Sequence, residues 1–144
     1  MRWGSCRSLI ACCGLAAVVG LGYAAGRAHA HGLVGLGTIA AVVLSVAALV
    51  RSRPVERVAG AALLLWEFSA ALTEQFAWVA SDREGLVAAA WLVLPVAGGA
   101  VLPATGHWRS GLGCWAASFA GVAATTYSVH SVYSGAGLIM VWRY

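Results

Sequence analysis

The sequence contains very little charge and no lysine. Charged residues make up 10% of its 144 residues, and all nine basic residues are arginines. Soluble domains carry about 25% charged residues, so the composition excludes an ordinary water-soluble domain. Hydrophobic residues make up 61% of the chain, and a small globule has too much surface to hide them from water. Lipid is therefore the expected solvent.

Other absences exclude classes of function. No basic run is longer than the three arginines within residues 51–57, so we expect no nucleic-acid partner. The four cysteines form neither a Cys-x-x-Cys pair nor a disulfide framework. The sequence contains no Gly-x-Ser-x-Gly, phosphate loop, dinucleotide fingerprint or His-Glu-x-x-His motif. Because the segments between apolar runs are also short, we expect that the protein is not an enzyme.

What the sequence does contain is a series of apolar runs. Each run is about 17–23 residues long, which is the length that a helix needs to cross about 30 Å of hydrocarbon. The runs do not alternate as the strands of a membrane barrel would, and only helices satisfy every backbone group internally. We predict an all-α integral membrane protein, a single domain over residues 1–144, with five hydrophobic helices at 9–25, 33–50, 58–80, 86–102 and 112–133.

The first run has two interpretations, which the sequence leaves open. Residues 1–8 are short and basic, and an apolar stretch follows at 9–25. Ala28-His29-Ala30 then resembles the small-x-small site at which a signal peptide is cleaved. Residues 1–30 are therefore either a cleaved signal peptide, leaving four helices, or a retained segment that contains the first span.

The arginines predict an orientation. With the N-terminus inside, the inner segments hold six arginines and the outer segments hold three, which is the asymmetry of the positive-inside rule. The inner ones are Arg2, Arg7, Arg51, Arg53, Arg57 and Arg109, and the outer ones are Arg27, Arg83 and Arg143. We therefore expect a cytoplasmic N-terminus in a multi-pass protein of a bacterial plasma (inner) membrane.

The third run contains the strongest candidate for a functional residue. Glu67 lies close to its middle, where a charged residue costs about 2.5–3.5 kcal/mol on insertion scales. Glu74 follows seven residues later on the same helical face. Two carboxylates on one face are typical of a proton or cation path. The alternative is structural: the Glu67 carboxyl hydrogen-bonds a neighbouring helix or subunit.

Histidines are the second candidate. His29 and His31 follow the first run, and His130 lies near the outer end of the last run, so all three are expected on the outer side. Imidazole and carboxylate ligands suit Zn, Cu or Ni. The other interpretation is that these histidines belong to a solvated loop.

The last run carries small residues at steps of four, three and four: Cys114, Ser118, Gly121 and Thr125. Such a stripe lets helices approach closely within a membrane. We expect it to serve helix packing.

Two functional hypotheses follow. In the favoured one, the protein is a non-catalytic accessory or assembly subunit of a larger membrane complex, and its partners are the lipid bilayer and other membrane subunits or further copies of itself. In the alternative, it transports or senses a proton, a small cation or a metal through Glu67 and Glu74, with a capture site at His29, His31 and His130.

Overall fold

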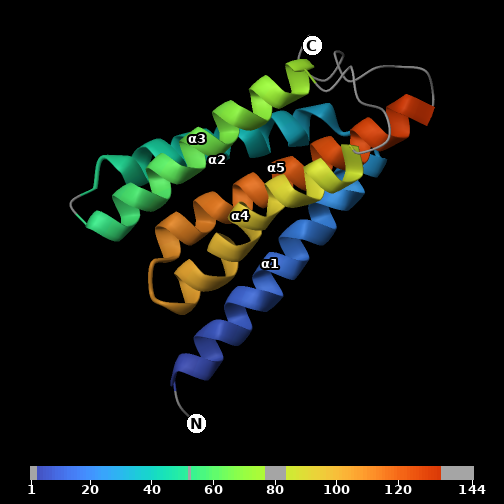
Figure 1. Ribbon diagram of the computed structural model, residues 1–144. Helices are drawn as coiled ribbons and strands as arrows, with labels where there is room; N and C mark the ends of the chain where they lie inside the picture. Colours follow the sequence, from blue (N-terminus) through green and yellow to red (C-terminus); the bar gives the residue numbers. More distant parts are fainter. Residues whose placement is uncertain (1–2, 52, 77–83, 134–144) are drawn as a thin grey trace.

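The described part of the chain is entirely helical. The computed structural model describes the backbone of residues 3–51, 53–76 and 84–133, and within it the side chains of residues 6–51, 53–69 and 92–126. These residues form no strand and five helices (Figure 1): α1 (Trp3–Arg27), α2 (His31–Leu49), α3 (Pro54–Phe76), α4 (Glu84–Ala104) and α5 (Trp108–Tyr133). The prediction of an all-α chain with five helices is thereby confirmed.

The helices are longer than most of the apolar runs from which they were predicted. The first begins at Trp3 rather than at residue 9, and the fourth continues to Ala104 rather than ending at residue 102. Polar residues can continue a helix, which ends only where the backbone changes direction. The predicted end of the third run, at residue 80, lies outside the described residues.

Two of these ends have the same geometry. After α1, His29 has φ of 52°, its N–H donates to the Gly26 carbonyl, and the Ala30 N–H donates to the Ala25 carbonyl. This is the hydrogen-bond pattern of a Schellman cap, in which the residue after the helix takes the left-handed conformation. Glycine usually occupies that position, because a side chain there is strained.

The end of α4 repeats the cap with the expected residue. Gly106 has φ of 91°, its N–H donates to the Pro103 carbonyl, and the His107 N–H donates to the Leu102 carbonyl. α5 begins at the next residue, Trp108. Both caps thus produce tight turns, and successive helices run in opposite directions.

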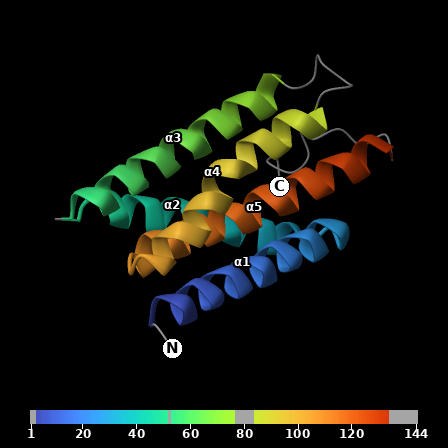
Figure 2. The same ribbon diagram turned by 60° about the horizontal axis from the view of Figure 1, so that its bottom comes forward.

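The helices form a bundle around α5. This helix packs along α1, α2 and α4, whereas α3 lies at the edge and packs mainly against α2 (Figures 1 and 2). The start of α1, the α2–α3 connection and the α4–α5 connection lie toward the same end of the bundle. The α1–α2 turn lies toward the opposite end.

Glycines set the distance between α1 and α5. A Cβ atom on Gly22 would lie 2.7 Å from the Phe119 carbonyl oxygen, and one on Gly26 would lie 2.5 Å from the Ala123 carbonyl oxygen. Both separations are too short for a real side chain, so the two backbones are in direct contact. The spacing is Gly-x-x-x-Gly, which is typical of close helix pairs in membranes. α1 is therefore an integral part of the bundle.

The bundle buries small side chains and exposes large ones. Among the described side chains, the buried apolar residues include seven alanines but only three larger aliphatic residues, Leu15, Val34 and Leu63. Large apolar side chains lie instead on the outside, for example Leu36 at 64% exposure and Leu65 at 70%. A water-soluble protein has the opposite distribution, because burial of large apolar groups is what stabilises it.

A tryptophan of α5 supplies a hydrogen-bond donor that the backbone of α4 lacks. Pro103 has no N–H, so the carbonyl of Gly99, four residues earlier, loses its helical donor. The Trp115 indole N–H donates to that carbonyl instead, at 2.8 Å from nitrogen to oxygen. A Cβ on Gly99 would lie 2.8 Å from the Trp115 ring, which therefore fits only because residue 99 is glycine. α4 and α5 are joined at this point by both packing and a hydrogen bond.

Candidate functional site

The inner face of α3 carries Glu67. One turn before it, Leu63 is only 2% exposed and belongs to an apolar cluster with Ala41 of α2 and with Cys114 and Ala117 of α5. Both carboxyl oxygens of Glu67 are buried, and neither has a hydrogen-bond partner among the described residues. The carboxyl oxygens are therefore shielded from solvent, although Glu67 as a whole is only half-buried.

A serine of α2 lies beside this carboxyl. Ser45 is fully buried and its hydroxyl lies near the Glu67 carboxyl, although no hydrogen bond of normal geometry joins the two groups. The two side chains are close because α2 and α3 pack tightly against each other. Two turns before Glu67 on α3, a Cβ on Gly60 would lie 2.5 Å from the Ser45 carbonyl oxygen. α2 and α3 thus bring together three side-chain oxygens within apolar surroundings.

This polar pair, Ser45 with Glu67, is costly unless something satisfies it. An unsatisfied buried polar group costs about 1–3 kcal/mol, and more if it is charged. Native interiors contain few such groups, and each one calls for an explanation such as a functional role or a bound ion or water. Oxygen ligands of this kind can hold a proton or a small hard cation.

Glu74, the second carboxylate predicted for this site, is described by its backbone alone. Glu74 lies on α3, two turns beyond Glu67 and about 10 Å along the axis. The helix is continuous between the two residues, so their Cα atoms share a face. The side chain of Glu74 lies outside the described residues.

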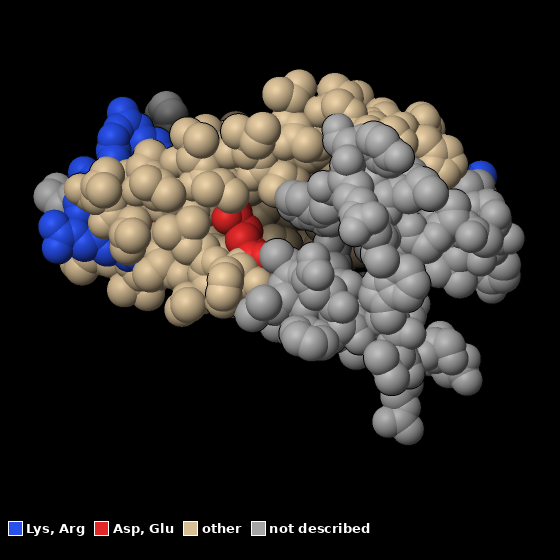
Figure 3. Space-filling view, turned by 90° about the horizontal axis from the view of Figure 1, so that it is seen from above, with Lys and Arg blue, Asp and Glu red and all other residues tan. Residues whose placement is uncertain are grey.

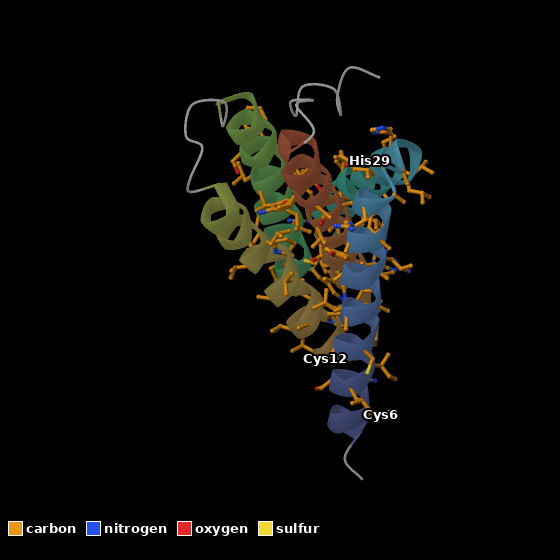
Figure 4. The ribbon with its side chains drawn as sticks, turned by 90° about the vertical axis from the view of Figure 1, so that its right-hand side faces the viewer. Cys6, Cys12 and His29 are labelled. Carbon is orange, nitrogen blue, oxygen red and sulfur yellow. The ribbon has the colours of Figure 1, made fainter. Side chains whose placement is uncertain are left out.

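His29 and His31 lie near the start of α2, whereas Ser45 lies fourteen residues after His31, about 21 Å along the same helix. His29 occupies the α1–α2 turn and His31 is the first residue of α2, and both are exposed. Figure 4 shows His29 at the opposite end of α1 from Cys6. His130 lies on α5, but its side chain is outside the described part. Within that part, no group of three His, Cys, Asp or Glu side chains is arranged to hold a metal ion.

The small-residue stripe of α5 lies against α4. A Cβ on Gly98 would lie 2.6 Å from Cys114 Sγ, and one on Gly121 would lie 2.6 Å from Leu92 Cδ2. The hydroxyls of Ser118 and Thr125 each donate to the carbonyl four residues earlier, at 2.8 Å. The polar atoms of the stripe are therefore satisfied within their own helix, and its small side chains admit α4.

A second polar region was missed by the sequence reasoning, which used the arginines only to orient the chain. An open cleft of about 310 Å³ lies where the α2–α3 and α4–α5 connections meet, and we call it the arginine cleft. Its lining residues are Arg51, Arg53, Glu56, Gly106, Trp108 and Arg109. In Figure 3 most of the visible basic side chains, in blue, gather at one end of the molecule, on the left of the view.

The alternation of helix directions was the signal that could have revealed this cleft. Residues 51–57 and 103–111 are separated by two helices, and therefore return to the same end of an up-and-down bundle. Glu56 is 4% exposed, and its Oε2 lies 3.6 Å from Arg51 Nη1. A buried acid among arginines indicates an organised surface rather than a scatter of charges.

The helices themselves carry a further indication of their environment. The segments Cys6–Arg27 of α1 and His31–Leu49 of α2 are long and apolar enough to cross a membrane. These two candidate spans suggest a membrane protein.

Comparisons with known proteins add no relative. No protein-family model, curated protein or solved structure matches this chain.

Proposed function

We propose that this chain is a non-catalytic, multi-pass membrane protein with all five helices in the bilayer and its N-terminus on the cytoplasmic side. α3, α4 and α5 have 23, 21 and 26 residues, and about 20 residues suffice to span the hydrocarbon. The arginine-rich end is then the inner surface, as the positive-inside rule requires. The bacterial plasma membrane is the proposed location.

The distribution of side-chain size supports this location. On α3 and α4, the exposed faces carry Phe68 at 64% exposure and Val93 at 64%, in addition to Leu65. Contiguous apolar surfaces of this kind are rare on soluble monomers. Membrane bundles instead bury small residues between helices, because lipid solvates large apolar side chains as well as the interior does.

Within the membrane, we propose that the chain holds a proton or a small monovalent cation at Glu67, with Ser45 as a second oxygen ligand. The observation that carries this function is that both Glu67 carboxyl oxygens are buried without a partner among the described residues. Intramembrane acids commonly lie on ion or proton paths. Because these oxygens are shielded by this chain, they are better placed for an internal ligand than for a neighbouring subunit.

An accessory or assembly role is the second candidate. α3 lies at the edge of the bundle and presents Val58, Leu65 and Phe68 on its surface, at 70%, 70% and 64% exposure. Such an edge helix offers an apolar face to another membrane subunit or to a second copy of the chain. Under this role Glu67 stabilises α3 from within.

Glu67→Gln distinguishes the two roles. In proteoliposomes with an imposed pH or Na⁺ gradient, we expect ion flux from the wild type and its loss in Glu67→Gln. Ser45→Ala should reduce the flux, and Glu84→Gln, at the first residue of α4, should leave it unchanged. Equal flux from protein-free, wild-type and Glu67→Gln vesicles would refute the ion site. Under the accessory role, gentle purification yields a partner subunit, and Phe68→Ala weakens its retention.

A further inference from the structure

The arginine cleft has the charge of an anion-binding site. Arg51, Arg53 and Arg109 contribute three positive charges and Glu56 one negative charge, so the lining carries a net charge of +2. Glu56 forms an ion pair with Arg51. Arg53 and Arg109 have no acidic partner among the described residues. Two guanidinium groups that have no acidic partner in the described part of the chain therefore border the same cleft.

The starts of two helices add partial positive charge near the cleft. α3 begins at Pro54 and α5 at Trp108, and both starts lie next to the cleft. The first N–H groups of a helix have no partner within the helix, and the macrodipole places partial positive charge there. Phosphates commonly bind at helix starts for this reason. Arg57 Nε also donates to the Arg51 carbonyl, which links the first turn of α3 to the residue that lies just after α2.

Glu56 holds one of the arginines of the cleft in place. It is almost completely buried, and its Oε2, which is closed off from solvent, lies 3.6 Å from Arg51 Nη1. The charge of Arg51 is therefore balanced within the chain, which leaves Arg53 and Arg109 as the groups that face an incoming anion.

The volume of the cleft and its proposed position at the membrane surface favour a lipid headgroup over a larger molecule. Small-molecule pockets have volumes of about 300–1,000 Å³, and this one is at the lower limit, with about 310 Å³. Trp108 lines it, and tryptophan is enriched at the headgroup level of membranes. In the proposed orientation, the cleft opens at the inner surface, where anionic lipids attract arginines.

We propose that the arginine cleft binds the phosphate of an anionic glycerophospholipid through Arg53 and Arg109. This inference rests on the proposed membrane location, and it is independent of the ion site at Glu67. Phosphatidylglycerol has the required chemistry. Inorganic phosphate shares the anionic group, but it lacks the acyl chains that would hold it at the membrane surface.

The test uses the full-length protein in nanodiscs that contain phosphatidylglycerol and phosphatidylcholine, with retained lipids counted by native mass spectrometry. We expect selective retention of phosphatidylglycerol by the wild type. Each arginine near an anionic surface changes binding about fivefold, so Arg53→Gln/Arg109→Gln should lower the selectivity about twenty-five-fold. Arg27→Gln, at the opposite end of α1, is the matched control and should retain full selectivity.

Several outcomes would overturn the proposal. A wild type without selectivity would do so, and so would an Arg27→Gln variant that loses as much selectivity as the double variant. Displacement of the lipid by an equal concentration of inorganic phosphate would assign the site to the free ion. Failure to enter nanodiscs would instead refute the membrane location itself.

Discussion

Replacement of Trp115 by phenylalanine should remove the donor that compensates for Pro103. The Gly99 carbonyl lies in the α4–α5 contact, where Pro103 cannot donate to it and Trp115 does, at 2.8 Å. A buried carbonyl without a donor costs about 1–3 kcal/mol in water-soluble proteins. Interhelical hydrogen bonds in a membrane average about 0.6 kcal/mol and reach about 1.7 kcal/mol. We therefore expect this hydrogen bond to contribute about 1 kcal/mol to the free energy of unfolding.

A double-mutant cycle isolates this contribution from the smaller size of the phenyl ring. Pro103→Ala restores a backbone N–H that can donate to Gly99, so the loss of Trp115 should cost about 1 kcal/mol less in that background. Unfolding is followed by far-ultraviolet circular dichroism during titration of detergent-solubilised protein with sodium dodecyl sulfate. The signal is independent of how many tryptophans each variant contains.

Trp108→Phe is the matched control for the cycle. The Trp108 ring packs edge-on against Trp115, with centroids 6.3 Å apart, but its indole N–H makes no hydrogen bond among the described residues. It should therefore show no coupling to Pro103→Ala. If Trp115→Phe costs the same in both backgrounds, within about 0.3 kcal/mol, the proposed compensation is refuted.

Two further predictions concern glycine geometry and use the same unfolding assay. His29→Gly should stabilise the bundle by about 1 kcal/mol, because φ of 52° strains a residue with a side chain; a variant less stable than the wild type would contradict the cap. Gly22→Ile should destabilise by about 1–3 kcal/mol through its clash with the Phe119 carbonyl. Gly20→Ile, whose Cβ would meet nothing within 4 Å, should change stability by less than about 0.5 kcal/mol, and equal effects of the two isoleucines would refute the close contact.

The helices could be predicted because each one is also a long apolar run, and run length is a local property. The residues at which the helices end were harder to predict from the sequence. Gly106 is the residue that a left-handed cap favours, but His29 adopts the same conformation with a side chain that is strained there. At that position the packing of α1 on α5 outweighs the local preference, and a single sequence does not reveal this.

The candidate site was predictable in depth but not in its contacts. Position within the run indicated that Glu67 lies near the middle of a helix, but it did not indicate Ser45, which lies on another helix. The arginine cleft similarly joins residues that are more than fifty positions apart, Arg51 and Arg109. Such pairs depend on how helices pack against one another, so they emerge only once the bundle is assembled.

The ionisation of Glu67 tests the central claim most directly. Infrared difference spectra of the reconstituted protein, recorded between acidic and alkaline pH and with or without Na⁺, report the carbonyl stretch of a neutral carboxyl group. We expect a band that is absent from Glu67→Gln, present in Glu56→Gln, and lost as the pH or the Na⁺ concentration rises. A Glu67 band that stays constant under all these conditions would identify a permanently neutral structural carboxyl and would contradict the proposed ion site.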